Sequence, residues 1–253
     1  DAAKLDNSDL DVIFSGVDSE VARKLEPDYA RTTPVISTAA AFRYEEDTPI
    51  LIPTVNDEHI ELLREQQRRR NWKGFIAPMA NCTTIGLAIS LKPIQDSFGV
   101  ESVIMTSMQA VSGAGRSSGV LTLDIIDNVI PFIPKEEDKV QRESAKILGR
   151  LSGGKVVPAD MRVSCTCTRV NVRDGHTESV SVSTRRECGI EDVKDAMRKF
   201  NVGVRKAGLP SSPDEMIIVA EDPFRPQPRL DRDNCGGMAT TVGRMRKDEA
   251  LDR

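Results

Sequence analysis

The sequence contains 253 residues, of which 39% are hydrophobic and 29% are charged, and its formal net charge is -4. This composition excludes a disordered chain and allows one large or two modest domains with a sizeable core. The weak negative charge excludes a global attraction to nucleic acid, and no apolar stretch reaches the roughly 18 residues of a membrane helix. We therefore expect a cytoplasmic chain with no nucleic-acid or membrane partner.

The first third of the chain has strand patterns that alternate with helical patterns. Buried-strand patterns occur at residues 11–14, 34–38 and 74–78, and helical patterns follow Ser19 and Asn56. Because this order requires parallel strand pairing, we expect an α/β layer over residues 1–81. The basic run at residues 68–70 is interpreted as the end of a solvated helix.

A different pattern begins at Cys82. It predicts a helix over 83–98, a strand over 102–111, a helix near 190–200, and strands over 216–221 and 240–246. Two alternating stretches, 161–172 and 176–184, flank a hairpin-like turn at Asp174 and Gly175. These elements predict an α+β domain over residues 82–253, with antiparallel strands and helices on one side of the sheet.

Five cysteines are spread along the chain: Cys82, Cys165, Cys167, Cys188 and Cys235. Their odd number and wide spacing argue against a disulfide framework, so we expect reduced thiols. Alternation along a strand places Cys165 and Cys167 on one face, and their spacing differs from that of common zinc knuckles. We interpret these two as packing residues and expect no metal site.

The stretch APMANCTTIGLAIS, residues 77–90, places Cys82 at the start of a predicted helix. Free backbone N–H groups and the positive end of the helix dipole favour a thiolate there, which makes Cys82 a candidate nucleophile. The same residue fits a small buried hydrophobe, and Asn81 with the threonines fits an ordinary N-cap. The local sequence leaves both interpretations open.

A nucleophilic cysteine needs a proton carrier, and the chain has two histidines. His59 lies near a predicted helix start and is interpreted as a solvated surface residue. His176 follows a turn, from which its side chain can project toward a cleft. Arg169, seven positions earlier, can bind a carboxylate with its planar guanidinium or pair with a neighbouring acid on the sheet, and spacing alone does not separate these roles.

Four motifs occur together in one order: ANCTT at 80–84, QAVSGAG at 109–115, RESAKILG at 142–149, and CTRVNVRDGHTESV at 167–180. With them the chain resembles aspartate-semialdehyde dehydrogenase, particularly its archaeal and fungal branch, over nearly its whole length. The resemblance implies the remnant of a Rossmann-type NADP-binding domain over residues 1–81. It also implies an α+β catalytic and dimerisation domain over residues 82–253, like that of glyceraldehyde-3-phosphate dehydrogenase.

The implied activity is the NADPH-dependent reductive dephosphorylation of L-4-aspartyl phosphate to L-aspartate 4-semialdehyde, an oxidoreductase step in lysine, threonine and methionine biosynthesis. By resemblance, Cys82 is the nucleophile, His176 the acid or base, and Gln109 the residue that orients the reacting group. The implied substrate-binding residues are Arg169 for the α-carboxylate, Glu143 for the amino group, and Asn81, Lys146 and Arg43 for the phosphate. The implied cofactor-binding residues are Ser15, Gly16, Ser37, Ser112, Gly113 and Gly115.

Other readings stay open at this point. N-acetyl-glutamyl-phosphate reductase shares the thioester chemistry, and a non-catalytic or hydrolytic domain could retain Cys82 and His176. The stretch SGAGRSSG, residues 112–119, is one residue longer than a dinucleotide-binding fingerprint. The family's first strand and Gly-rich turn are not found before Asp1, and its last strand and helix are not found after Arg253, so we expect a chain truncated at both ends. The resemblance also implies a homodimer or homotetramer.

Overall fold

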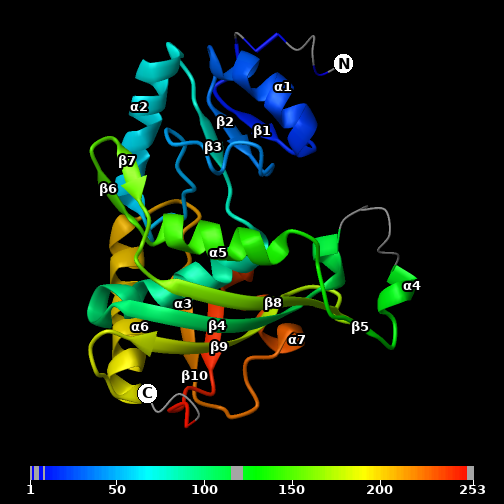
Figure 1. The fold of residues 1–253 in the computed structure, drawn as a ribbon, viewed down its shortest axis with the longest axis vertical. Coiled ribbons are helices and arrows are strands. Elements are labelled where there is room, and N and C mark those ends of the chain that lie inside the picture. Colours follow the sequence, from blue (N-terminus) through cyan, green and yellow to red (C-terminus); the bar gives the residue numbers. More distant parts are fainter. Residues whose placement is uncertain (1, 3–5, 8, 115–121, 250–253) are drawn as a thin grey trace. The chain divides into compact units, whose positions relative to one another are not determined.

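The computed structural model describes residues 2, 6, 7, 9–114 and 122–249, whose helices and strands are labelled in Figure 1. They form two compact units. The first contains residues 1–81 and 143–159, and the second contains residues 82–142 and 160–253. The sequence pattern indicated a change at Cys82 but not that residues 143–159 pack with the first unit. The functional assignment of residues 1–81 and 82–253 to two domains stays a prediction.

The first unit is built on a parallel sheet with the strand order β1-β2-β3. Its strands are β1 (Ile13–Ser15), β2 (Val35–Ser37) and β3 (Ile76–Pro78), and its helices are α1 (Ser19–Ala30), η2 (Asp57–Ile60) and α2 (Glu61–Arg70). The predicted alternation of strands and helices is therefore confirmed. Ser15 pairs in register with Ser37, and Ser37 with Pro78. The carboxyl ends of the three strands consequently lie along one edge of the sheet.

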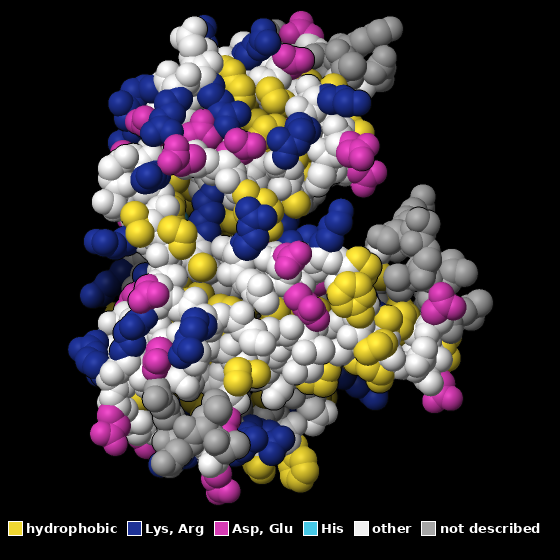
Figure 2. All heavy atoms as spheres, viewed as in Figure 1, with side chains coloured by type: hydrophobic (Ala, Val, Ile, Leu, Met, Phe, Trp, Pro, Cys, Tyr) yellow, Lys and Arg dark blue, Asp and Glu magenta, His cyan; other side chains and the backbone are white. Residues whose placement is uncertain are grey.

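The core of the first unit is formed by small and aliphatic side chains between α1 and the sheet. Ala22 and Ala30 of α1, Val35 of β2 and Ile76 of β3 are fully buried in one cluster. Helix α2, in contrast, carries charged side chains near its end. Its Glu65 pairs with Arg68 and Arg69 of the predicted basic run. Basic and acidic side chains are interspersed on the face of the molecule that Figure 2 shows. The interpretation of the basic run as a solvated helix end fits Arg68 and Arg69, whereas Arg70 is partly buried and pairs with the buried Asp47 at 2.6 Å.

Residues 143–159 contribute the end of α5 (Glu136–Ile147) and a small antiparallel pair, β6 (Arg150–Ser152) and β7 (Lys155–Val157). A Cβ at Gly149 would lie 2.4 Å from the carbonyl oxygen of Val157, so only glycine fits there. His59 is fully buried, with Nδ1 3.0 Å from Nδ2 of Asn56 and Nε2 3.2 Å from the carbonyl of Gly149. The prediction that His59 is a surface residue is wrong, because its partner lies 90 positions away in the sequence.

The second unit is built on a four-stranded mixed sheet with the order β5-β8-β4-β9. The strands are β4 (Val100–Gln109), β5 (Val129–Ile130), β8 (Arg162–Val170) and β9 (Thr177–Thr184). β4 runs parallel to β8 and antiparallel to β9. The predicted hairpin is therefore wrong, because β4 lies between the two strands that were expected to pair. The chain after β8 crosses two strand spacings, about 10 Å, before β9 begins.

Helices α3 (Cys82–Phe98) and α6 (Ile190–Ala207) pack against each other, and α3 also contacts β4 and β9. In Figure 1, α3 lies behind the sheet. The inward side chains Val103 and Met105 of β4 are buried, whereas the outward Ile104 is 51% exposed. Alternation along β4 thus separates a covered face from an open one. Among the described residues, no helix is long and apolar enough to cross a membrane.

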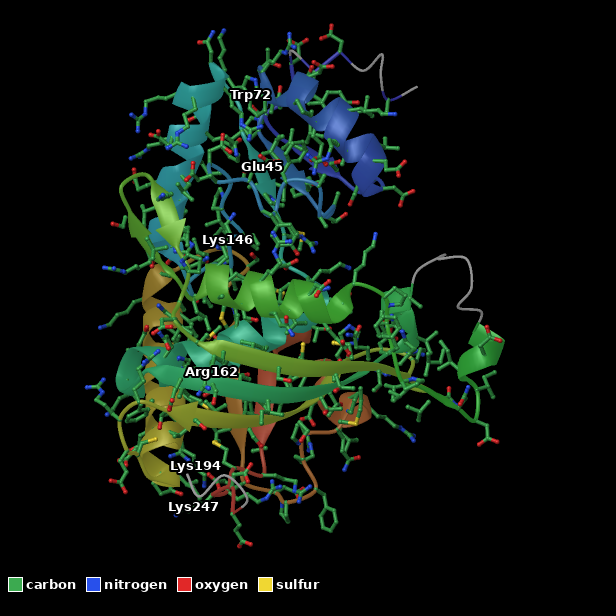
Figure 3. All side chains as sticks on the ribbon, in the orientation of Figure 1. Glu45, Trp72, Lys146, Arg162, Lys194 and Lys247 are labelled. Atoms are coloured by element: carbon green, nitrogen blue, oxygen red, sulfur yellow. The ribbon has the colours of Figure 1, made fainter. Side chains whose placement is uncertain are left out.

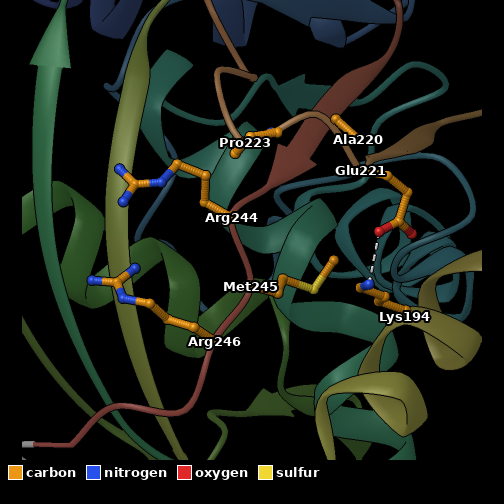
Figure 4. A pocket seen from close by; sticks show the side chains of 7 residues that line it. All are labelled: Lys194, Ala220, Glu221, Pro223, Arg244, Met245 and Arg246. Carbon is orange, nitrogen blue, oxygen red and sulfur yellow. Dashed lines mark hydrogen bonds and ion pairs between the residues drawn. The ribbon is translucent and has the colours of Figure 1, made fainter.

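A separate parallel pair, β10 (Ile217–Ala220) and β11 (Thr240–Gly243), packs beside α6. Asn201 of α6 accepts the N–H groups of Met216 and Ile217 through Oδ1 and donates Nδ2 to the carbonyl of Ile217. An open hollow next to this pair is bordered by Met245 and by the ion pair between Lys194 and Glu221 (Figure 4). The remaining short helical segments are η3 (Val111–Ala114), α4 (Thr122–Ile125), α7 (Pro228–Asp231) and η4 (Asn234–Gly237).

The buried contacts of His59 predict a stability effect. His59→Ala should remove both hydrogen bonds and leave the Gly149 carbonyl and the Asn56 amide without these partners, at a cost of about 2–4 kcal/mol in the free energy of unfolding. The measurement is the urea midpoint of unfolding followed by circular dichroism. Ile60→Ala, at a neighbouring position that is 47% exposed, is the control and should change the midpoint little. Equal midpoints for the two variants would contradict a structural role of His59.

Candidate active site

The second unit brings together Cys82 and His176, which are 94 positions apart. Cys82 is the first residue of α3, and His176 immediately precedes β9. Nε2 of His176 lies 3.3 Å from Sγ of Cys82. This distance allows a hydrogen bond between imidazole and sulfur, the arrangement needed to move a proton at a nucleophilic cysteine.

Arg169 and Gln109 lie next to this pair, at the ends of neighbouring parallel strands. They form a register pair between β8 and β4. Arg169 is 5% exposed; its Nη1 donates to the carbonyl of Ala110 at 2.8 Å, and its buried Nε has no hydrogen-bond partner among the described residues. Gln109 is buried and donates to Oγ of Ser107 at 3.3 Å. An unpartnered guanidinium N–H in a buried position indicates a place for an anionic ligand group.

The protonation of the Cys82–His176 pair is set mainly by burial. Although Cys82 is exposed as a residue, desolvation of its sulfur raises the pKa of the thiol, and the nearby Glu136 carboxylate adds to this. Hydrogen bonds from Thr83 and the charge of Arg169 oppose the rise. Burial, followed by Arg169, lowers the pKa of His176. Desolvation therefore opposes the effect of the helix start, which by itself favours the thiolate. The role of Cys82 as the nucleophile stays a prediction.

Glu136 is a member of this site that the sequence did not indicate. It is the first residue of α5, is 5% exposed, and accepts a hydrogen bond from Nζ of Lys139 at 3.0 Å. Its carboxylate acts on the pKa values of Cys82, Arg169 and His176. In the sequence it looks like one of several acids in the first turn of a helix, where acids are common, so no local signal marked it.

Glu143 and its partners belong to the first unit. Glu143 is fully buried, and its Oε1 lies 3.0 Å from Nη1 of Arg43 and 3.3 Å from the hydroxyl of Tyr44. Its Oε2 accepts the backbone N–H of Asn81 at 2.7 Å. Arg43 also donates Nη2 to the carbonyl of Thr38, while its buried Nε has no partner among the described residues. The charge of the Glu143 carboxylate is thus compensated by groups of its own unit. One of these groups, the N–H of Asn81, belongs to the residue that directly precedes Cys82 in the sequence.

Lys146 lies one turn further along α5 and is labelled in Figure 3. Its ammonium donates to the backbone carbonyls of Arg43, Glu45 and Thr48 at 2.8, 2.9 and 2.6 Å. These three bonds match the three N–H donors of a lysine. Lys146 therefore fixes the loop that carries Arg43.

The residues expected to bind a dinucleotide lie in both units. In the first unit, Ser15 and Ser37 end β1 and β2, and a Cβ at Gly16 would meet open space. The hydroxyl of Ser37 donates to Oε1 of the buried Glu26 at 2.5 Å and accepts the N–H of Ala39 at 3.1 Å. The carboxyl edge of a parallel sheet is where dinucleotides bind, so this edge fits such a cofactor.

In the second unit, Ser112 and Gly113 belong to η3. A Cβ at Gly113 would lie 3.0 Å from Nη1 of Arg169 and 3.1 Å from Cε1 of His176. The absence of a side chain therefore allows Arg169 and His176 to pack closely against Gly113. Gly115 lies outside the described residues.

Cys165 and Cys167 take part in packing contacts, whereas Cys235 is exposed. Cys167 is fully buried, and its N–H donates to Oε1 of Glu137 at 3.1 Å. Cys165 lies within hydrogen-bond distance of the Glu137 carbonyl, with Sγ 3.5 Å away. No group of three or more potential metal ligands occurs among the residues that the structure describes.

Comparisons with known proteins agree over most of the chain. The family model "Semialdehyde dehydrogenase, NAD binding domain" matches residues 1–63, and "Semialdehyde dehydrogenase, dimerisation domain" matches residues 91–253. The chain is 48% identical to aspartate-semialdehyde dehydrogenase of Methanothermobacter thermautotrophicus over 243 residues, covering 96% of this chain and 70% of the relative. The Candida albicans enzyme of the same name is 42% identical over 258 residues, covering 96% and 71%.

Solved structures give the same result. The Candida albicans aspartate semialdehyde dehydrogenase with NADP superposes with a TM-score of 0.83 at 39% identity, covering 94% of this chain and 69% of that chain. Aspartate semialdehyde dehydrogenase II of Vibrio cholerae complexed with ASA superposes with a TM-score of 0.76 at 28% identity, covering 98% and 72%. These matches do not support the alternatives of an N-acetyl-glutamyl-phosphate reductase or a non-catalytic domain. With the motifs, the two-unit fold and these relatives in agreement, the chain belongs to the aspartate-semialdehyde dehydrogenase family.

Proposed function

We propose that the chain converts L-4-aspartyl phosphate to L-aspartate 4-semialdehyde with NADPH, through a thioester on Cys82. The observation that carries the proposal is the 3.3 Å approach of His176 Nε2 to the Cys82 sulfur. The buried, unpartnered Nε of Arg169 beside this pair supports a substrate carboxylate at the same place. A nucleophile, a proton carrier and a carboxylate-binding group thus occur together in the second unit.

In the proposed reaction, the Cys82 thiolate forms a bond to the acyl carbon while the bond from that carbon to the phosphate oxygen breaks. Phosphate leaves, and the acyl group remains as a thioester. NADPH, when bound, supplies the hydride that reduces this acyl group. The carbon–sulfur bond then breaks, the semialdehyde is released, and His176 is the group assigned to proton movement at the sulfur. Gln109, buried at the end of β4, orients the reacting group.

For the first unit we propose that Arg43 and Asn81 act on the substrate phosphate. The buried Nε of Arg43, without a partner among the described residues, supports this role. The contacts of Glu143 to the Asn81 N–H and of Lys146 to the Arg43 carbonyl support a role in holding these two residues. Direct contacts of Glu143 with the substrate amino group and of Lys146 with the phosphate, which the family resemblance implies, stay predictions.

The edge formed by Ser15, Gly16 and Ser37 would hold part of the dinucleotide, and Ser112 and Gly113 would lie at its reactive end. Open space at Gly16 supports close approach of the backbone to a ligand there, and the contact of Gly113 with His176 and Arg169 supports a place beside the reacting groups. Because the Ser37 hydroxyl already donates to Glu26, it can only accept a hydrogen bond from the cofactor.

We further propose that the chain forms a homodimer through the outer face of the four-stranded sheet. The matched dimerisation-domain model includes this sheet. The outer face is polar and hydroxyl-rich, with Thr106, Ser164 and Thr166 exposed around the 51% exposed Ile104. A second copy of the chain would cover Ile104, which the first copy leaves open.

Replacement of the nucleophile is the first test of this proposal. Cys82→Ser should reduce phosphate-dependent NADP reduction with aspartate semialdehyde to below about one thousandth, because a serine hydroxyl is a far weaker nucleophile near neutral pH. Circular dichroism should be unchanged, since the substitution is nearly isosteric. Cys235→Ser, at another exposed cysteine, is the control and should keep full activity. Retained turnover by Cys82→Ser would contradict the thioester mechanism.

The carboxylate-binding role of Arg169 predicts a specific loss. Arg169→Lys keeps the charge but removes the planar pair of donors, so kcat/KM for the semialdehyde should fall by about 10- to 150-fold, the equivalent of about 1.5–3 kcal/mol. Steady-state kinetics provides the measurement. Arg162→Lys, at the exposed start of the same strand, is the matched control. An unchanged kcat/KM in Arg169→Lys would limit Arg169 to a structural role.

The proposed dimer predicts an effect on assembly. Ile104→Arg should shift the chain from dimer to monomer, because a charge would be buried at the centre of the sheet face. Sedimentation velocity at several protein concentrations measures this shift. Val202→Arg replaces another exposed aliphatic residue, on α6, and should leave the assembly unchanged. A dimer that persists in Ile104→Arg would place the interface elsewhere.

A further inference from the structure

The main chain of Ala110 contacts two side chains of the proposed active site. Ala110 is fully buried and directly follows the last residue of β4. Its N–H donates to Nδ1 of His176 at 3.0 Å, and its carbonyl accepts from Nη1 of Arg169 at 2.8 Å. One residue thus holds both the proposed proton carrier and the proposed carboxylate-binding group.

The segment after Ala110 is held firmly in place. The N–H groups of Val111 and Ser112 donate to the carbonyls of Val172 and Arg173 at 2.8 and 3.0 Å. These bonds join the end of β4 to the loop between β8 and β9. Because the main-chain groups of Ala110 are fixed by their neighbours, they can fix the side chains bound to them.

The contact to Nδ1 determines which nitrogen of His176 carries the proton. A backbone N–H is a donor only, so Nδ1 must accept and must be unprotonated. In a neutral imidazole the proton is then on Nε2, the nitrogen that faces the Cys82 sulfur. An imidazolium would carry an additional N–H on Nδ1, which would point at the N–H of Ala110.

We propose that Ala110 is a positioning residue that fixes His176 as the neutral tautomer with its proton on Nε2. Through its carbonyl, Ala110 sets the orientation of Arg169 at the same time. In the free chain, Cys82 and His176 are therefore an uncharged thiol and imidazole, and the imidazole donates to the sulfur. Uptake of a proton by His176 requires its ring to give up the Ala110 hydrogen bond.

The charged groups around the pair support the uncharged state. Arg169 faces His176 from β8 and opposes a second positive charge, whereas Glu136 faces it from α5 and favours one. Burial and Arg169 outweigh Glu136, so the pKa of His176 is lowered. From α3, the Cys82 thiol has a raised pKa, so it offers little negative charge to stabilise an imidazolium.

Gly113 supplies a second, independent contact with the same ring. An added Cβ would lie 3.1 Å from Cε1 and 3.3 Å from Nε2 of His176, which is closer than ordinary contact. Alanine at this position would therefore press the ring away from its place. Gly203 of α6, where an added Cβ meets nothing within 4 Å, provides a matched control for the glycine-to-alanine change.

The chain has two histidines, which makes the tautomer directly measurable. In ¹⁵N NMR of the full chain near pH 7, we expect His176 to show an unprotonated Nδ1 and a protonated Nε2. His176→Asn removes one of the two ring systems and assigns the signals. His59, whose Nε2 faces the Gly149 carbonyl, is an internal reference for the same tautomer. A protonated Nδ1 on His176, alone or together with Nε2, would overturn the proposal.

A perturbation by alanine and a reactivity profile complete the test. Gly113→Ala should shift the His176 ring signals, and Gly203→Ala should not; unchanged signals in both would overturn the close contact.

The rate of Cys82 alkylation by iodoacetamide should rise with pH through one transition above the ordinary thiol pKa, and the same transition should appear in His176→Asn. A reactive plateau at acid pH that is lost in His176→Asn would indicate an ion pair and overturn the proposal.

This inference rests on the proposed function for the roles of Cys82, His176 and Arg169, but its measurements need no turnover. The expected tautomer in a chain that lacks dehydrogenase activity would overturn the proposed function alone. Full activity with a protonated Nδ1 would overturn the positioning role alone.

Discussion

The buried carboxylate of Glu143 is the constraint on which the first unit depends. A carboxylate without exposure is costly unless donors surround it, and here a guanidinium, a phenol and a backbone N–H supply them. These donors, on Arg43, Tyr44 and Asn81, lie 100, 99 and 62 positions from Glu143 in the sequence. Satisfying one charge therefore fixes the backbone of Asn81 and ties residues 143–159 to the remainder of the unit.

The positive charge of Lys146 is likewise compensated by polar groups that surround it. Its ammonium is compensated by three carbonyl groups of the loop that carries Arg43. Glu143 and Lys146, three positions apart on α5, thus bind different parts of one loop region. The family motif RESAKILG contains both residues, so the motif marks a structural network as well as a proposed substrate-binding one.

The sequence predicted local features well and distant pairings poorly. The spacing of apolar residues and the short connections between elements are local properties of the sequence. They predicted the parallel strands of the first unit and the helix that begins at Cys82. The position of β4 between β8 and β9 could not be predicted, because the turn at Asp174 and Gly175 looks the same whether or not a third strand lies between. The burial of His59 was missed for the same reason, since the carbonyl it contacts is supplied by Gly149.

The active site also has features that the sequence predicted and features that it did not. The resemblance to a family predicted the identities of Cys82, His176 and Arg169, and the structure places these three together. The charge state of the pair was not predictable, because helix position indicates the direction of one electrostatic effect but not the degree of desolvation. Glu136 was missed because its influence depends on the docking of α5 against β8, seen in the bond from the Cys167 N–H to Glu137.

An uncharged resting pair has a chemical consequence for an enzyme that uses a thioester. A thiol that is mostly protonated reacts slowly with adventitious electrophiles, since the thiolate is the nucleophile. Activation then has to come from the substrate itself. A carboxylate bound at the unpartnered Nε of Arg169 would neutralise the positive charge that opposes protonation of His176. Because Nε2, which faces the sulfur, already carries a proton in the proposed tautomer, the imidazole can take the Cys82 proton only if its ring turns to present Nδ1. Because such a transfer also requires release of Nδ1 from Ala110, substrate binding and thiolate formation would be coupled through Arg169 and Ala110, which share one hydrogen bond.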